Sequence, residues 1–345
     1  MIREAIIAMV DEDRDLTEAE ATAVMHEIMG AADEDGPTEA QFGAFVTALR
    51  MRGETAEVIT GMARAMRDHS LRVSIEERPL LDTAGSGGSR KIFNASTAAA
   101  FVAAAAGAKV AKHGNRAMTS KSGSADFLEA LGAEIALSPE QVASCVSQTG
   151  VGFMFAQSFH PAMKFAGPLR QQIGVRTIFN ILGPLTNPAG ANCHVMGVAT
   201  PELGEKMAAA LAALGVRHAI VAAGDDGLDD ITVCGSTTTF EVRGTEITRG
   251  TLTPEQIGLS SYPADAIDGG TAEENAAIMR AVFAGEGPPA VHDLICANAG
   301  AGLYVTGLAS SIKGGVAMAR EVIESGDAAA RVGAFVEATR RAARG

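Results

Sequence analysis

The sequence contains no tryptophan, only two tyrosines and only four cysteines among its 345 residues. The scarcity of large aromatic rings leaves little material for the stacking platforms on which single-stranded nucleic acids bind. The cysteines are widely separated and form no Cys-x-x-Cys pair, so neither a structural zinc site nor a thioredoxin-like motif is indicated. Four scattered thiols in a chain of this size predict reduced, mostly buried side chains in a cytoplasmic protein.

Positive charge and long apolar runs are also limited. The net charge is −13, from 41 acidic and 28 basic residues. This balance disfavours duplex DNA and anionic membranes as partners, because non-specific binding to both depends on Lys and Arg. The longest apolar run, residues 98–108, is too short and too rich in alanine to span a bilayer, and residues 1–4 do not resemble a secretory signal. We therefore expect a cytoplasmic protein without nucleic-acid or membrane partners.

One stretch of this acidic chain has no acidic side chain at all. Between Asp82 and Asp126 there is no Asp or Glu, and the same stretch contains the glycine-rich segment 85–89 and the Lys-Ser-Gly-Ser segment 121–124. Six cations lie within it: Arg90, Lys91, Lys109, Lys112, Arg116 and Lys121. Glycines that let backbone N–H groups approach a ligand, hydroxyls, and fixed cations without a competing anion predict a polyphosphate site.

The chain divides into a helical start and an α/β remainder. Residues 1–72 carry helix signals, including a capping box that begins at Thr17 and an apolar stripe over residues 42–49. We expect a small all-helical domain here, whose remaining exposed apolar residues predict a subunit interface. From Leu80 onward, strands alternate with glycine-containing loops and helices, which predicts a mainly parallel sheet flanked by helices.

The expected elements of the α/β part follow this rhythm. Strands are predicted at residues 80–81, 109–111, 151–156 and 218–223; helices are predicted from Ser96 or Thr97 to Gly107, at 124–131, at 139–149, at 201–214 and through most of the chain after Thr271.

The glycine loop lies between a predicted strand and a predicted helix, so its ligand would lie over the helix N-terminus. It has neither the Walker A ending nor the GxGxxG spacing, and on its own such a loop is more often a simple turn. Two polar segments, 93–97 and 112–116, strengthen the polyphosphate interpretation. The loops that contain these two segments are expected at the same edge of the parallel sheet, where α/β proteins bind ligands.

An acidic loop follows the strand predicted at 218–223. Asp225, Asp226, Asp229 and Asp230 place four carboxylates within six residues, where they repel one another unless they are solvated or share a cation. The loop alone is equally consistent with a solvated acidic turn. Beside a polyphosphate site, a Mg²⁺ site is favoured, because Mg²⁺ binds one or two carboxylates together with phosphate oxygens and waters.

A third group of residues comprises His160–Lys164, Arg170 and the segment 176–188. Together with Lys112–Arg116, Lys121–Asp126 and Gly227–Asp229, these motifs resemble the anthranilate phosphoribosyltransferase family along the whole chain. The resemblance implies a nucleoside-phosphorylase-like α/β fold. A helical domain of residues 1–72, completed by about 163–188, would adjoin an α/β domain of residues 78–162 and 189–345. It also implies a homodimer formed through the helical domain.

The resemblance also implies an activity and a set of site residues. The enzyme would transfer the phosphoribosyl group of 5-phosphoribosyl 1-diphosphate (PRPP) to the amine of anthranilate, the second step of tryptophan biosynthesis. Lys112, Asn115 and Arg170 would position the reactants. Anthranilate would be held by Gly85, Asn115, His160 and Arg170, and Mg²⁺ by Ser96, Asp229 and Asp230. PRPP would be held by Gly85, Gly87, Gly88, Ser89, Asn94, Ser96, Thr97, Lys112, His113, Gly114, Asn115, Arg116, Ala117, Met118, Thr119, Ser120 and Ser124.

The glycine loop departs from the family pattern. Residues 85–94 are one residue fewer than usual, with Ser89 in place of an acid and Ile92 in place of a threonine, while Arg90 and Lys91 add positive charge. The usual Asp-Glu pair of the acidic loop is replaced by two aspartates.

Two alternative functions share this fold. A pyrimidine-nucleoside phosphorylase is disfavoured by the residues assigned to anthranilate, namely Asn115, His160 and Arg170. A non-catalytic nucleic-acid-binding relative is disfavoured by the retained carboxylate pair and by the net charge of −13.

Overall fold

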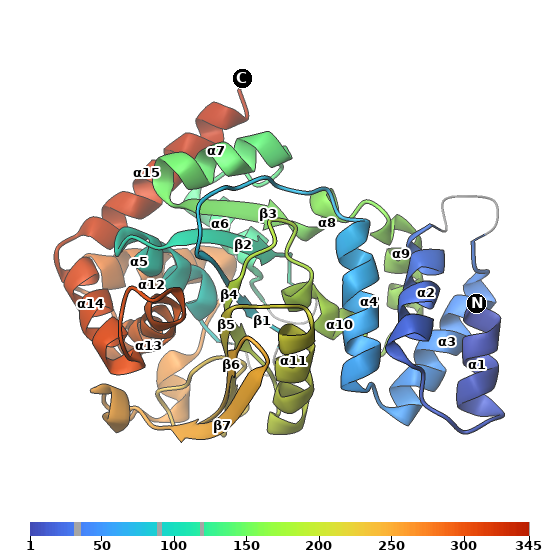
Figure 1. The fold of residues 1–345 in the computed structure, drawn as a ribbon. Helices are drawn as coiled ribbons and strands as arrows, with labels where there is room; N and C mark the ends of the chain where they lie inside the picture. Colours follow the sequence, from blue (N-terminus) through green and yellow to red (C-terminus); the bar gives the residue numbers. More distant parts are fainter. Residues whose placement is uncertain (31–35, 88–91, 118–120, 345) are drawn as a thin grey trace.

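The computed structural model describes residues 1–30, 36–87, 92–117 and 121–344. Four N-terminal helices lie beside an α/β body, with α4 between the other three and the sheet (Figure 1). They are α1 (Ile2–Val10), α2 (Glu18–Met29), α3 (Glu39–Arg52) and α4 (Ala56–Asp68).

Local sequence accounts for where these helices begin. Thr17, Thr38 and Thr55 each accept a hydrogen bond from the backbone N–H three residues later, which satisfies an otherwise unpaired donor of the first turn. The capping box predicted at Thr17 is confirmed, since the side chain of Glu20 accepts from the Thr17 N–H in return. The apolar stripe of α3 is buried as predicted.

Within the described residues, the sheet has seven strands in the order β3-β2-β1-β4-β5-β6-β7. The first five in this order are parallel, and β6 and β7 continue the sheet as an antiparallel hairpin. Their bounds are β1 (Leu80–Gly85), β2 (Lys109–Gly114), β3 (Val151–Phe155), β4 (Cys193–Gly197), β5 (His218–Gly224), β6 (Thr237–Arg243) and β7 (Glu246–Leu252). The strands β4, β6 and β7 were not predicted from the sequence.

Helices cover both faces of the sheet. On one face α13 packs against α5 and against β1, β4 and β5, while α11 packs between the sheet and α4 on the other face. The remaining helices are α5 (Ala95–Ala105), α6 (Ser124–Leu131), α7 (Pro139–Thr149), α8 (Ala156–Phe159), α9 (Met163–Ile173), α10 (Phe179–Leu182), α11 (Pro201–Ala213), α12 (Ala272–Phe283), α13 (Pro289–Thr306), α14 (Ile312–Glu324) and α15 (Asp327–Ala342). Short 3₁₀ turns occur at Gly183–Leu185, Glu255–Ile257 and Ala264–Ile267.

The mid-chain helix α9 leaves the α/β body and packs against α2 and α3. The ring of Phe42 in α3 meets Phe165 of α9 and Phe179 of α10, each with ring centroids 5.7 Å apart. These residues belong to one apolar cluster that continues through α4 into α11, β4, β5 and β6. The packing supports a helical domain completed by residues 163–188, but the predicted domain boundaries stay a prediction.

This arrangement confirms the predicted fold class, a helical domain beside a mainly parallel sheet flanked by helices. In the described part of the chain, no helix is both long enough and apolar enough to cross a membrane.

Candidate active site

The candidate site lies where β1, β4 and β5 end. Gly85 at the end of β1 pairs with Gly197 at the end of β4, and the acidic loop after β5 passes directly over both. A Cβ atom on Gly197 would overlap the Asp229 carbonyl oxygen, and one on Gly85 would collide with the Asp229 carboxylate. Glycine at these two positions therefore lets the acidic loop close onto the strand ends, so that Asp229 lies beside the first glycine of the predicted polyphosphate loop.

The four carboxylates of the acidic loop have different surroundings. Asp225 accepts hydrogen bonds from the Ser236 N–H (3.0 Å) and hydroxyl (2.8 Å). Asp226 accepts from the Thr232 hydroxyl (3.0 Å) and the Leu228 N–H (3.2 Å). These two carboxylates shape the loop, which leaves the Asp229–Asp230 pair as the candidate for a cation.

Asp230 is 7% exposed. Its pKa is raised well above the usual range, first by burial and then by Asp229, while Lys112 opposes the shift. Two neighbouring carboxylates of this kind are stabilised as anions by a bound divalent cation.

Lys112 in β2 is a buried cation that interacts electrostatically with Asp230. Its Nζ donates to the Thr83 carbonyl oxygen and lies 3.3 Å from the Ser96 hydroxyl, so the predicted phosphate cation and the predicted metal ligand are neighbours. Burial lowers the Lys112 pKa, whereas Asp82 and Asp230 raise it. Both carboxylates therefore favour the charged form of this lysine.

Asp82 lies next to the candidate site, and the sequence analysis did not single it out. It is fully buried in β1, where its carboxylate accepts from the His113 N–H (3.1 Å) and the Asn187 side-chain amide (2.7 Å). Burial raises the Asp82 pKa to about 6. Asn187 also donates to the Ala111 carbonyl of β2 (2.8 Å). The bonds of Asn187 therefore hold the loop after α10 against β1 and β2.

In the folded chain, Arg116 lies next to carboxylates, although its own stretch of sequence has none. Its guanidinium pairs with Asp126 (3.0 Å) and with Glu129 on α6 (Nη2 to Oε1, 2.8 Å). Asp126 also accepts from the N–H groups of Ala117 (2.9 Å) and Gly123 (3.0 Å). The expectation that no anion competes for these cations is therefore wrong for Arg116. The assignment of Arg116 to PRPP stays a prediction, and this geometry argues against a direct contact through its side chain.

Two helix N-termini converge on the same edge. The Thr97 hydroxyl in the first turn of α5 donates to the hydroxyl of Ser124, the first residue of α6 (3.2 Å). The Ser124 end of α6 also approaches β2, since a Cβ atom on Gly114 would contact the Ser124 side chain. Aligned helix N-termini favour anions, so Ser96, Thr97, Gly114 and Ser124 are brought together where a diphosphate would be stabilised.

Several residues assigned to PRPP lie outside the described ranges. They are Gly88, Ser89, Met118, Thr119 and Ser120, and Arg90 and Lys91 of the short glycine loop lie outside as well. Gly87 is described and has a φ of 78°. Asn115 is exposed, and its Oδ1 accepts from the Arg116 N–H (2.8 Å). Its assignment to anthranilate stays a prediction.

Buried polar groups on the other side of β2 form the candidate site for an aromatic substrate. His113 and His160 have ring centroids 5.0 Å apart, and His113 Nδ1 lies 3.0 Å from the Gly183 carbonyl oxygen. Within the described residues, the buried Nε2 atoms of both histidines and the hydroxyls of Ser86 and Thr177 have no hydrogen-bond partner. Buried polar groups without partners are costly, so they indicate a place for a polar ligand.

Burial sets the charge of these two histidines. Burial lowers the His113 pKa to about 4 and the His160 pKa to about 3, so both rings are neutral at pH 7.

Arg170 on α9 lies over the Phe179 ring, 5.4 Å from its centroid, and burial lowers the Arg170 pKa. Arg176 donates to the Ser86 carbonyl (3.2 Å) and so joins the 176–188 segment to the glycine loop.

We expect His160→Gln to make stability less sensitive to acid. The folded-state pKa of His160 is depressed, so the unfolded chain binds the proton first as the pH falls below about 6.5, and the wild type loses stability there. Between about pH 7 and about pH 5 this single group costs the wild type roughly 2 kcal/mol that the variant does not lose. Urea unfolding of both proteins across this range measures the difference. If the free energy of unfolding fell equally in both proteins over this pH range, His160 would not be a neutral, buried group in the wild type.

The donor set at the acidic pair suits magnesium. Among the described residues there is no group of three or more His, Cys, Asp and Glu side chains that could hold a metal ion unaided. Mg²⁺ requires fewer ligands from the protein, because it binds one or two carboxylates and completes its coordination shell with phosphate oxygens and waters. Asp229, Asp230 and the Ser96 hydroxyl are hard oxygen ligands of this kind, so the residues fit a magnesium ion that arrives with a polyphosphate.

Comparison with known proteins identifies the family. Two family profiles match the chain: the glycosyl transferase family helical bundle domain over residues 3–70, and the glycosyl transferase family a/b domain over residues 77–329. Anthranilate phosphoribosyltransferase from Chloroflexus aurantiacus is 50% identical over 341 residues, which cover 98% of this chain and 99% of the relative.

Solved structures extend the likeness to three dimensions. The crystal structure of anthranilate phosphoribosyltransferase from Thermus thermophilus superposes with a TM-score of 0.91 at 42% identity, covering 98% of this chain and 99% of that one. The enzyme from Saccharomyces cerevisiae in complex with PRPP and Mg superposes with a TM-score of 0.89 at 26% identity, covering 99% and 98%. With identity near one half along its whole length, this chain belongs to the anthranilate phosphoribosyltransferase family.

Proposed function

We propose that this chain transfers the 5-phosphoribosyl group from PRPP to the amine of anthranilate, giving N-(5-phosphoribosyl)anthranilate and diphosphate in the second step of tryptophan biosynthesis. The observation that carries the proposal is the position of the Asp229–Asp230 pair over Gly85, beside Lys112 and Ser96. A carboxylate pair beside a buried cation and two helix N-termini is suited to a magnesium diphosphate.

The reaction requires the protein mainly to position the two substrates and to neutralise the charge of the diphosphate. Departure of diphosphate leaves positive charge on the ribosyl carbon, and an aromatic amine is already neutral and nucleophilic at pH 7. No strong general base is needed, which suits a site whose two histidines are weak bases, with pKa values lowered to about 4 and about 3. Lys112 and the first turns of α5 and α6 would bind the leaving diphosphate.

Magnesium is proposed as the cofactor. The relative from Saccharomyces cerevisiae was solved with PRPP and Mg, and in this chain Asp229, Asp230 and Ser96 would hold the ion. When bound, it would neutralise the charge that develops on the leaving diphosphate.

Anthranilate would lie between α9 and β2. The Arg170 guanidinium can pair with its carboxylate in a planar fork, and the unpartnered Nε2 atom of His160 offers a neutral polar contact nearby. Asn115 and Gly85 would complete the contacts on the side of the PRPP loops.

A fluorescence assay of anthranilate consumption tests the proposal. The purified chain should consume anthranilate only when PRPP and Mg²⁺ are both present. Phosphorolysis of a pyrimidine nucleoside under the same conditions would instead support the phosphorylase alternative. A gel shift that weakens steeply with salt would support the nucleic-acid-binding alternative.

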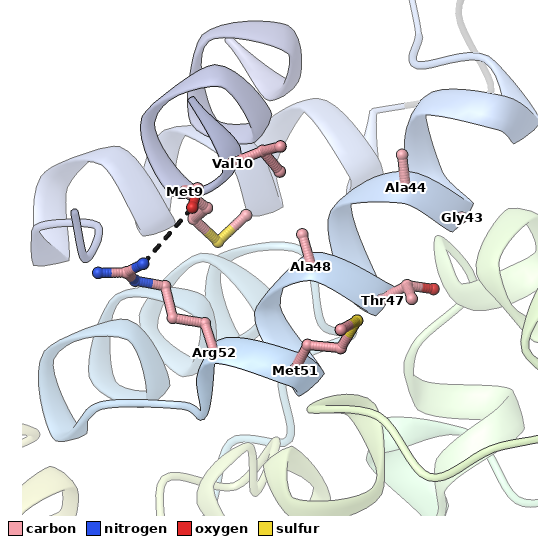
Figure 2. A pocket seen from close by; sticks show the side chains of 8 residues that line it. All are labelled: Met9, Val10, Gly43, Ala44, Thr47, Ala48, Met51 and Arg52. Atoms are coloured by element: carbon pink, nitrogen blue, oxygen red, sulfur yellow. Dashed lines mark hydrogen bonds between the residues drawn. The ribbon is translucent and has the colours of Figure 1, made fainter. Parts of the chain in front are cut away.

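We further propose a homodimer formed through the helical domain. A groove of about 710 Å³ lies between α1 and α3. It is lined by the apolar side chains of Met9, Val10, Ala44 and Ala48, with Met51 beside them (Figure 2). Met51 is 84% exposed and Val10 is 61% exposed. Large exposed apolar side chains gathered around one groove favour an interface, and a second copy of the chain is the occupant we propose.

Met51→Glu is expected to weaken this dimer at least about tenfold, because an unpaired charge buried at an interface is strongly destabilising. Analytical ultracentrifugation over a concentration series measures the change. Leu308→Glu is the matched control, since Leu308 is an exposed leucine (44%) outside the helical domain and should leave the dimer unchanged. Equal association of both variants would place the interface elsewhere.

A cytoplasmic location is also proposed. All four cysteines are free thiols, and three of them are buried. Unpaired cysteines are typical of proteins kept in a reducing compartment.

A further inference from the structure

Asn94, which immediately precedes α5, is held by residues distant in the sequence. Its Oδ1 accepts hydrogen bonds from the Ser122 hydroxyl (2.8 Å) and from Asn275 Nδ2 on α12 (2.8 Å). Its own Nδ2 donates to the Ser122 carbonyl oxygen (3.2 Å). Because an amide oxygen has two lone pairs, these two bonds occupy both of them.

This arrangement changes what Asn94 does at the start of α5. An asparagine at this position ordinarily accepts from the second or third N–H of the helix, and so satisfies one of the four unpaired donors there. Asn94 makes no such cap bond. Its oxygen is already occupied, so the first-turn N–H groups of Ser96 and Thr97 are left for a ligand rather than for the side chain of Asn94.

Asn275 is itself firmly placed. It is fully buried, and its Oδ1 accepts from the Gly270 N–H (2.8 Å). The segment before α12 lies against the end of the glycine loop: the Phe93 N–H donates to the Ile267 carbonyl (3.2 Å), and Ile92 forms a β-bridge with Asp268. Asn275 therefore approaches Asn94 from a fixed position in α12.

We propose that Asn275 is a positioning residue for diphosphate binding. By donating to Asn94 Oδ1, it diverts the Asn94 side chain from capping α5 and keeps it joined to Ser122, two residues before α6. The first turn of α5 then stays open for the anion beside the Ser124 end of α6. Without this donor, Asn94 can turn its oxygen onto the first turn of α5 and compete with the diphosphate. The inference rests on the proposed function and deepens it.

Asn275→Ala tests the inference in the full-length protein. We expect the KM for PRPP to rise about fivefold to tenfold, corresponding to ~1–1.4 kcal/mol, while the KM for anthranilate and kcat change less than about threefold. The dissociation constant of inorganic diphosphate with Mg²⁺, measured calorimetrically, should rise by the same factor as the KM for PRPP.

Thr271→Ala is the matched control. It removes the N-cap of α12 four residues from Asn275 and leaves the Asn275 side chain in place. We expect it to lower Tm but to leave the KM for PRPP unchanged, because a smaller folded fraction does not alter KM. If Asn275 were merely structural, Asn275→Ala would show this same pattern, and the inference would be overturned.

A double-mutant cycle checks that Asn275 acts through Asn94. In an Asn94→Ala background, Asn275→Ala should change the KM for PRPP less than about twofold, whereas independent effects would add. If Asn275→Ala does not fold, Ser122→Ala removes the other donor to Asn94 Oδ1 and should raise the KM for PRPP in the same direction. A wild type that does not consume anthranilate would refute the proposed function. An active wild type whose variants keep the PRPP KM would refute this inference alone.

Discussion

Asp229→Asn combined with Asp230→Asn is expected to lower kcat/KM by roughly 10²–10³-fold, the range found when a group that stabilises transition-state charge is removed. The pair lies over Gly85 beside Lys112, where it would hold Mg²⁺ against the diphosphate. The fold should persist, because an amide matches a carboxylate in size and burial already disfavours the charged form of Asp230. The contact of the Asp229 backbone with Gly197 is retained. Steady-state rates at limiting and saturating Mg²⁺ measure the loss, and the Mg²⁺ requirement should rise.

Asp225→Asn is the matched control for this double variant. It removes one carboxylate from the same loop, but the Asp225 carboxylate is engaged by the N–H and hydroxyl of Ser236. We expect less than about a threefold change in kcat/KM, as for substitutions outside the reacting centre. Wild-type activity of the double variant at limiting Mg²⁺ would show that the pair does not hold the metal.

Arg170→Ala should weaken the use of anthranilate far more than the binding of PRPP. Arg170 is largely buried over the Phe179 ring, so a pair between its guanidinium and the substrate carboxylate would be desolvated. Removing one member of such a pair costs roughly 2–5 kcal/mol, since the other charge is left without a partner. The rate at low anthranilate should therefore fall by some 30-fold or more.

Titrating each substrate against the Arg170→Ala variant separates the explanations. Lys164→Ala removes an exposed cation from the same helix and should leave both KM values unchanged. Equal weakening of both substrates in Arg170→Ala would indicate that α9 is displaced. No weakening of either would remove Arg170 from the site.

The sequence predicted best those elements whose ends carry local signals. The helices α6 and α7 have the predicted bounds, 124–131 and 139–149, because each ends at a glycine in the left-handed region and α7 begins after a capping serine, Ser138. Such signals depend on a few neighbouring residues, so they can be read without knowledge of the fold.

Two of the three missed strands, β7 and β4, have no comparable signal. Every residue of β7 is at least partly exposed, so it lacks the alternation of apolar and polar residues that marks a half-buried strand. It forms through backbone pairing with β6, which a sequence pattern does not reveal. The five residues of β4 are all buried, including His194, and such a short run is hard to distinguish from a loop.

At the site, the sequence identified the residue types but not their pairings. The absence of carboxylates between Asp82 and Asp126 suggested an unopposed positive region, yet Arg116 pairs with Asp126 and Glu129. Neither the Asp82–Asn187 bond nor the Asn94–Asn275 bond could be anticipated, because their partners are 105 and 181 residues apart. Contacts of this range depend on the completed fold.

The apolar cluster that joins the N-terminal helices to the rest of the molecule has a consequence for synthesis on the ribosome. The inner faces of α2, α3 and α4 are covered by residues such as Leu169, Phe179 and Leu211, which are translated much later. At 5–20 residues per second, the interval between the end of α4 and the appearance of α11 is on the order of ten seconds. During that time the nascent helices expose apolar surface to solvent, so a chaperone bound to this segment would protect the emerging chain.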